Sequence, residues 1–472
     1  MKSKKQDLEF LFHPGSIALV GITSNHTSPL ADIFLGPLLD FEFKGELYPV
    51  NPKGGEIRGL KVYPDIKEIP GQVDHVIASI PARLGPHLMH DCTAIGVKAV
   101  HFFTAGFSES DEEGGATLEA EITQIARTGG VRLIGPNCMG IYCPESRLSF
   151  RSEFPKDSGA VAYLCQSGGN SIHMVQMGAA RGLRFSKVVS YGNAADINES
   201  DLLDYFIDDP DTKIIAIYIE GVKDGQRLVD TLAKAARVKP VVLLKGGVTE
   251  AGTRAVAGHT GALAGTDTTW DAICRQLRLI RVHSLEEMVD LLVTLSFMPP
   301  PEGRNVAIVG AGGGASVLAT DDCESNHLVV PQFTQEVRDQ LWEFMPKAGN
   351  SVKNPVDSQA IIWAPHQFVN TVRTVSNWEK INLLIGLLVS TDIFPSWSEQ
   401  SDMYKAIART MLESSKASSK PMAIVVQPGI RPEMTRNAFH IQQEFVSAGF
   451  PVYHSVAQAA NAISKFIEYC HH

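Results

Sequence analysis

The sequence predicts an α/β protein built from consecutive parallel sheets, on two observations. Short apolar runs rich in β-branched residues recur along the whole chain, and amphipathic stretches punctuated by Gly or Pro lie between them. The chain has 472 residues, which is enough for about three domains of roughly 150 residues each. Strands that alternate with helices over this length are typical of several α/β layers following one another.

Three sets of elements are expected. In the first third, strands are expected at residues 16–22, 46–52, 75–81, 98–106 and 131–137. A second set is expected at residues 160–169, 187–193, 213–221, 240–247 and 279–284. The third set begins with a strand, a Gly-rich turn and a helix over 305–324, and continues with strands at 381–390, 421–429 and 450–455 and a helix at 457–469. The first five strands each end in small polar residues, at the carboxyl edge where open α/β sheets bind ligands.

Two stretches separate these sets. Residues 151–158 are polar, and residues 298–305 contain three successive prolines, which cannot continue a helix and favour extended backbone. We therefore expect domains at residues 1–150, 151–300 and 301–472.

Composition excludes several classes of protein. The 42 Lys and Arg residues against 52 Asp and Glu residues leave a formal charge of −10, which disfavours nucleic acid as a main partner. No apolar run is long enough to cross a bilayer. The basic start is followed by Gln6, Asp7 and Glu9 instead of an apolar segment, so no secretion signal is expected. These features predict a cytoplasmic protein without a membrane partner.

The turn after the first strand is the first candidate site. Gly21, Thr23 and Ser24 are small enough to let backbone N–H groups approach a phosphate at a helix N-terminus, although an ordinary strand-to-helix turn has the same composition. A nicotinamide site expects an acidic residue at the end of the second strand. That position holds Lys53, which suits a phosphorylated ligand and argues against NAD.

Two further turns form the second candidate. Thr104, Ala105 and Gly106 end the fourth strand, and Asn137 and Cys138 end the fifth. They could offer backbone donors and an amide to a polar ligand. The alternative is two ordinary turns with Cys138 as a small buried hydrophobic residue.

The third candidate centres on His259, which lies in the small-residue segment 258–265. The absence of bulky neighbours predicts an accessible imidazole in a pliant loop, whereas a generic histidine is more often a structural residue. The turn of Ser167, Gly168 and Gly169 precedes a helix whose N-terminus would favour an anionic phosphate. Glu220 ends a strand and is placed to fix the imidazole tautomer, which would leave the other ring nitrogen as a nucleophile.

Seven motifs carry a resemblance over residues 8–469: VNPK (50–53), TAGF (104–107), IGPNC (134–138), QSGG (166–169), YGNAADINESDLLDYF (191–206), YIEGVKDG (218–225) and GHTGALAG (258–265). Together they resemble the alpha subunit of the NDP-forming (ADP-forming) acyl-CoA synthetases, in the superfamily of succinyl-CoA synthetase. The resemblance implies an N-terminal Rossmann-like CoA-binding domain, then a flavodoxin-like ligase domain with a phosphohistidine loop, then a second flavodoxin-like ligase domain.

The resemblance also implies residue roles. His259 is similar to the transiently phosphorylated histidine, and Glu220 to the carboxylate that orients it. The implied phosphate-binding residues are Ser167, Gly168, Gly169, Thr260 and Gly261. The implied CoA-binding residues are Gly21, Thr23, Ser24, Lys53, Ile80, Pro81, Thr104, Ala105, Gly106 and Asn137. No metal site is implied in this chain.

The implied reaction interconverts acyl-CoA, phosphate and a nucleoside diphosphate with a carboxylic acid, CoA and a nucleoside triphosphate. No ATP-grasp region follows Tyr469, so the resemblance implies a separate ATP-grasp beta subunit and a hetero-oligomer. ATP/ADP or GTP/GDP would bind that subunit with Mg²⁺.

Two departures from the family pattern leave a rival. The first turn, residues 21–26, differs from the usual small or basic sequence, and Ala194 stands where the family commonly has lysine. Both mildly favour a catalytically reduced CoA-binding regulatory or interaction subunit, whereas His259 and Glu220 argue against it. The scaffold half of a related protein acetyltransferase and a nicotinamide dehydrogenase are weaker alternatives.

Overall fold

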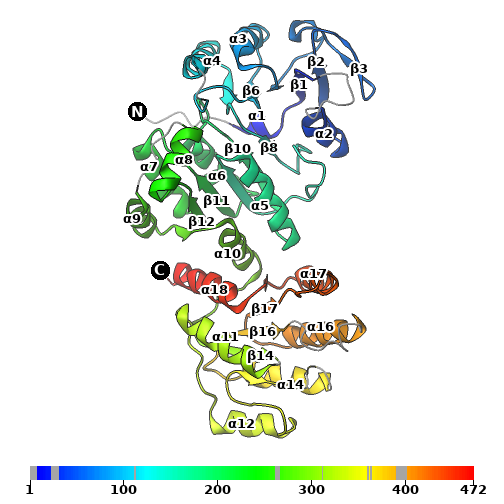
Figure 1. Ribbon diagram of the computed structural model, residues 1–472, viewed down its shortest axis with the longest axis vertical. Coiled ribbons are helices and arrows are strands. Elements are labelled where there is room, and N and C mark those ends of the chain that lie inside the picture. Colours follow the sequence, from blue (N-terminus) through cyan, green and yellow to red (C-terminus); the bar gives the residue numbers. More distant parts are fainter. Residues whose placement is uncertain are drawn as a thin grey trace. The chain divides into compact units, whose positions relative to one another are not determined.

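The computed structural model describes residues 8–22, 31–110, 113–260, 266–310, 312–358, 361, 364–389 and 401–471 (Figure 1). By backbone contacts the chain separates into two compact units, which are Met1–Ala179 with Arg184–Met288 and Ala180–Leu183 with Val289–His472. The three domains expected from the sequence remain a prediction. None of the described helices combines the length and apolarity needed to cross a bilayer.

The first unit begins with a five-stranded parallel sheet in the order β2-β1-β5-β6-β7. Its strands are β1 (Ser16–Val20), β2 (Glu46–Val50), β5 (His75–Ala78), β6 (Ala99–Phe102) and β7 (Arg132–Ile134). Around it lie the helices α1 (Glu9–Phe12), η1 (Ala31–Leu35), α2 (Gly36–Asp40), η2 (Ile66–Glu68), η3 (Ala82–Leu84), α3 (Gly85–Ala94) and α4 (Gly115–Gly129). A small hairpin is formed by β3 (Gly55–Ile57) and β4 (Leu60–Val62).

The same unit holds a second sheet, in the order β13-β12-β11-β9-β10-β8. The strands are β8 (Gly140–Tyr142), β9 (Val161–Cys165), β10 (Phe185–Ser190), β11 (Ile214–Ile219), β12 (Val241–Lys245) and β13 (Ile280–Val282), of which β8 alone is antiparallel among those described. Its helices are α5 (Gly168–Ala180), α6 (Glu199–Asp208), α7 (Gly225–Ala236), α8 (Glu250–Thr260) and α9 (Asp267–Leu277). The unit boundary lies within α10 (Leu285–Phe297).

The second unit contains a third sheet, in the order β15-β14-β16-β17-β18. The strands are β14 (Val306–Gly310), β15 (Val356–Asp357), β16 (Leu383–Leu388), β17 (Met422–Val426) and β18 (Val452–Tyr453). The helices are α11 (Gly313–Ser325), α12 (Gln335–Trp342), α14 (Pro365–Ser376), α16 (Ser401–Lys416), α17 (Pro432–Ser447) and α18 (Val456–Cys470). Residues 298–305, expected to be a linker, lie outside the helices and strands.

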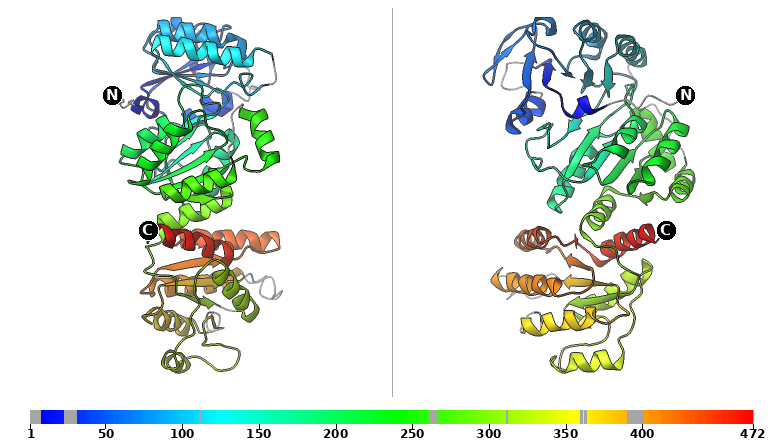
Figure 2. Two further views of the ribbon diagram at one scale, coloured as in Figure 1. Left: turned by 90° about the vertical axis from the view of Figure 1, so that its left-hand side faces the viewer. Right: turned by 180° about the vertical axis from the view of Figure 1, so that it is seen from behind.

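Side-chain alternation explains how helices cover both faces of the third sheet (Figures 1 and 2). Along β14, Val306 and Ile308 point into the core formed with α11 and α18. Ala307 and Val309 point into the opposite core, with α14, α16 and α17. Because successive side chains of a strand face opposite sides, a strand covered on both faces reads as a continuous apolar run. This is why these strands were recognisable in the sequence.

All three sheets share one doubly wound order. Numbered along the chain, the parallel strands of each run 2-1-3-4-5, including the first sheet, which the resemblance implied to be Rossmann-like. In this order the chain direction switches sides between the first and third strands, and ligands bind at that switch point, beyond the carboxyl ends. The switch points of the first unit lie between β1 and β5 and between β9 and β11.

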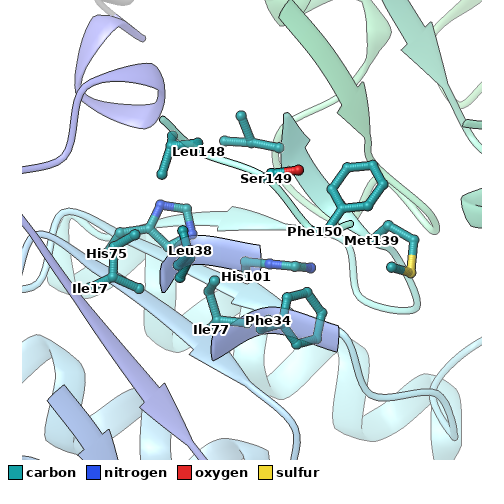
Figure 3. A pocket seen from close by; sticks show the side chains of 11 residues that line it. Ile17, Phe34, Leu38, His75, Ile77, His101, Met139, Leu148, Ser149 and Phe150 are labelled. Atoms are coloured by element: carbon teal, nitrogen blue, oxygen red, sulfur yellow. The ribbon is translucent and has the colours of Figure 1, made fainter. Parts of the chain in front are cut away.

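One face of the first sheet contains a pocket with two buried histidines (Figure 3). His75 and His101 lie on neighbouring strands among apolar side chains such as Phe34 and Leu38. His101 Nε2 donates to the Cys138 carbonyl at 2.9 Å, whereas His75 Nδ1 has no hydrogen-bond partner among the described residues. Burial lowers the pKa of His75 to about 3 and that of His101 to about 4. Both imidazoles are therefore neutral in the folded chain.

These two histidines predict a loss of stability in acid. Between the ordinary histidine pKa of about 6.5 and the lowered values, the unfolded chain binds protons that the folded chain does not, so the free energy of unfolding falls as pH falls. By pH 5 each histidine contributes a loss of about 2 kcal/mol. Urea denaturation at pH 7.5 and 5.0 measures it, and His75→Leu should reduce the difference between the two pH values. His90→Asn, at an exposed histidine, should leave that difference unchanged; an unaltered difference in His75→Leu contradicts the assignment.

Candidate functional site

Four turns meet at the carboxyl edge of the first sheet, after β1, β5, β6 and β7; we call them the edge turns. Thr104 connects two of them, because its hydroxyl accepts from the Ile80 N–H at 3.1 Å and donates to the Ile80 carbonyl at 2.6 Å. The Thr104 carbonyl accepts from the Asn137 N–H at 3.0 Å. Gly21 lies so close to the β5 turn that a Cβ there would overlap the Ser79 carbonyl. The structure thus brings Gly21, Ile80, Thr104 and Asn137 together.

The other residues of the predicted CoA site lie around these turns. Pro81 precedes η3, and Ala105 is exposed beside Gly106. Lys53 is exposed in the turn after β2, where its N–H donates to Asn51 Oδ1 at 3.0 Å. Its ammonium group is available to an anionic ligand at the edge next to β1. Thr23 and Ser24 lie outside the described residues.

The start of α5 forms the second part of the site. Ser167 precedes this helix, and its hydroxyl accepts from the Asn170 N–H at 3.3 Å. A Cβ on Gly168 would come within 2.9 Å of Met139, whereas a Cβ on Gly169 would meet nothing within 4 Å. The N-terminus of α5 is therefore open at Gly169 and adjoins, through Met139, the edge turn that contains Asn137. Free N–H groups at a helix N-terminus favour a phosphate.

Glu220 lies at the switch point of the second sheet, and two buried side chains fix its backbone. The Gln166 amide oxygen accepts from the Glu220 and Gly221 N–H groups, and its nitrogen donates to the Gly221 carbonyl at 2.9 Å. Lys245 Nζ donates to the Glu220 carbonyl at 2.7 Å. Burial lowers the pKa of Lys245 to about 8. Because Gln166 also precedes Ser167, one residue connects the predicted phosphate turn to the predicted orienting carboxylate.

His259 lies in the last turn of α8, so its backbone is helical. The prediction of a pliant loop at this residue is therefore wrong. The helix begins at Glu250 and contains two glycines, at positions 252 and 258, each of which lowers helix stability by only about 1 kcal/mol. The side chains of His259 and Thr260 lie outside the described part of the chain, as does Gly261. The roles of these three residues stay predictions.

Ala194 was singled out because the family commonly has a lysine there. The structure gives Ala194 a left-handed backbone, with φ at 51°, and Lys223 Nζ donates to its carbonyl at 3.2 Å. A positive charge is therefore present beside this position, supplied from the loop after β11.

Three buried side chains that organise the site were not assigned roles from the sequence: Gln166, Asn193 and Lys245. Gln166 immediately follows β9, Asn193 lies in the loop after β10, and Lys245 ends β12. A polar residue at or shortly after the carboxyl end of a strand is the signal that could have identified them. Their hydrogen-bond partners lie up to 85 residues away, and no local pattern indicates such pairs.

The chain is similar to known protein families and to individual relatives. Two family models match: a CoA binding domain over residues 15–144 and a succinyl-CoA ligase-like flavodoxin domain over residues 158–295. The alpha subunit of acetate–CoA ligase [ADP-forming] I from Pyrococcus furiosus is 32% identical over 468 residues, covering 98% of this chain and 97% of the relative. Acetate–CoA ligase [ADP-forming] from Methanocaldococcus jannaschii is 36% identical over 76% of this chain, which spans 50% of that relative.

A solved structure has the same fold along its whole length. Dinucleotide-forming acetyl-coenzyme A synthetase 1 of Ca. Korarchaeum cryptofilum, in complex with phosphate and ADP, superimposes with a TM-score of 0.82 at 30% identity. The match covers 98% of this chain and 97% of that one.

Proposed function

Because this chain belongs to the ADP-forming acyl-CoA ligase alpha-subunit family, we propose that it interconverts acyl-CoA, phosphate and ADP with a carboxylic acid, CoA and ATP. One observation carries the proposal: the edge turns and the open N-terminus of α5 adjoin, with Met139 packed against Gly168. A thioester held by the first sheet would then lie next to phosphate held by the second. The intact Glu220 turn gives no support to the catalytically reduced alternative.

The proposed sequence has three steps. A phosphate oxygen attacks the thioester carbonyl, the carbon–sulfur bond breaks, and CoA leaves as a thiolate that takes a proton. A ring nitrogen of His259 then attacks the phosphorus of the acyl phosphate, and the carboxylate leaves. Phosphohistidine finally transfers its phosphoryl group to ADP. The α5 N-terminus offers N–H groups to the phosphoryl oxygens, and Glu220 would orient the imidazole.

The nucleotide step needs a partner. The Pyrococcus relative is named a subunit alpha, and the chain spans half of the Methanocaldococcus relative, so we infer that an ATP-grasp beta subunit carries the nucleotide and its Mg²⁺. Mg²⁺ there would neutralise charge on the transferred phosphoryl group. With such a partner the enzyme would be a hetero-oligomer. Substrates such as CoA and nucleotides favour a cytoplasmic location.

A labelling experiment tests the proposal. The chain, mixed with its co-purified partner but without nucleotide, is incubated with labelled phosphate and a panel of acyl-CoA thioesters with short aliphatic, hydroxylated and aromatic acyl groups. We expect acid-labile, base-stable label on this chain and an equal amount of free CoA thiol for the cognate thioester. Release of CoA without label would indicate simple hydrolysis and would contradict the proposal.

A further inference from the structure

Asn193 links the second sheet to one of the edge turns through its side chain. Its amide nitrogen donates to Glu109 Oε2 at 2.5 Å and to Glu119 Oε2 at 2.8 Å. Glu109 in turn holds an edge turn, because its Oε1 accepts from the N–H groups of Gly106 at 2.6 Å and Phe107 at 3.2 Å. One buried amide therefore connects the loop after β10 to the turn that contains Thr104, Ala105 and Gly106.

The backbone around Asn193 holds another edge turn. The Asn193 N–H donates to the Pro136 carbonyl at 3.0 Å, and the Ala195 N–H donates to the Gly135 carbonyl at 2.9 Å. Gly192 packs so tightly that a Cβ there would overlap the carbonyl oxygens of Pro136 and Asn137. The loop after β10 and the turn after β7 thus form one closely packed backbone arrangement.

The charges around this amide make it hard to replace. Glu109 and Glu119 both direct a carboxylate oxygen at the same nitrogen, and Lys223 Nζ reaches Glu119 Oε1 at 3.5 Å from a half-exposed position. The two N–H bonds of this amide offset the mutual repulsion of the two carboxylates, and hydrogen bonds to charged groups are among the stronger ones in proteins. Without these N–H groups, repulsion between the two carboxylates would favour movement of Glu109 away from Glu119. That movement would weaken the hydrogen bonds of Glu109 with Gly106 and Phe107.

We infer that Asn193 is a positioning residue for CoA, which holds the Thr104–Gly106 and Gly135–Asn137 turns in the arrangement that receives the ligand. The inference rests on the proposed function, because it takes these turns as the CoA site. Asn193 makes this contribution from the loop after β10, which belongs to the second sheet of the unit.

Calorimetric titration of the full-length chain with CoA tests the inference. Asn193→Ala should weaken CoA binding by roughly tenfold or more, since hydrogen bonds to two carboxylates are lost. Asn193→Asp should weaken it further, because a third carboxylate then faces Glu109 and Glu119. The matched control is Asn198→Ala in the same loop, whose side chain caps α6 through the N–H groups of Ser200 and Asp201. This control should lower the melting temperature by about 2–4 °C and leave CoA affinity unchanged.

The outcomes separate the inference from the function beneath it. Unchanged CoA affinity in Asn193→Ala, or an equal loss of affinity in Asn193→Ala and Asn198→Ala, overturns the positioning role. If the wild-type chain binds no CoA, the proposed function itself fails.

Discussion

His259→Ala is expected to abolish phosphorylation of this chain and to lower acid-dependent nucleotide turnover by at least about a thousandfold, while CoA binding persists. The methyl group of alanine cannot accept a phosphoryl group, and loss of a covalent nucleophile removes the whole intermediate. CoA affinity should be unchanged, because the edge turns follow strands of the first sheet, whereas α8 follows β12 of the second sheet. Labelling with phosphate and acyl-CoA, followed by titration with CoA, measures both expectations.

The control for this variant is another histidine of the same unit. His283 is exposed after β13, and His283→Ala should label as the wild type does. Label retained by His259→Ala would assign the phosphoryl acceptor to another residue and remove the basis of the proposed sequence of steps.

Every described strand of four or more residues was expected from the sequence, and the strands that were missed have only two or three residues. Strands such as β11 and β12 are apolar throughout, because helices cover both faces of their sheet. The strands that were not expected are the hairpin β3–β4, the antiparallel β8 and the two-residue β15. Runs of two or three residues are too short to show a period, and pairing with another strand decides their conformation.

The candidate site also has a part that could be predicted from the sequence and a part that could not. Gly21, Ile80, Thr104 and Asn137 could be predicted to lie near one another, because parallel strands place their carboxyl ends at one edge. The support beneath them, such as Asn193 between Glu109 and Glu119, depends on side chains that meet across the fold. A sequence pattern reveals only the spacing of nearby residues, so these long-range polar contacts could be identified only in the structure. The helical backbone at His259 differs from the expected loop because glycine weakens a helix without ending it.

Gly21→Ala is expected to lower the free energy of unfolding by about 2–4 kcal/mol and to weaken CoA binding by at least roughly tenfold. Gly21 has φ at 97°, which L side chains rarely adopt, and an added Cβ would overlap the backbone carbonyl of Ser79. A backbone atom cannot rotate away as a flexible side chain can. The β1 and β5 turns must therefore separate, which disturbs the hydrogen bond from the Gly21 N–H to the Val50 carbonyl.

Gly55→Ala isolates the contact from the backbone strain. Gly55 has φ at 107°, close to that of Gly21, yet an added Cβ there meets nothing within 4 Å. It should therefore lose the strain alone, about 1–2 kcal/mol, and bind CoA as the wild type does. Urea denaturation and CoA titration of both variants compare the two sites. Equal losses of stability and of affinity would mean that the approach to Ser79 does not matter, whereas a loss of affinity confined to Gly21→Ala ties CoA to the switch point of the first sheet.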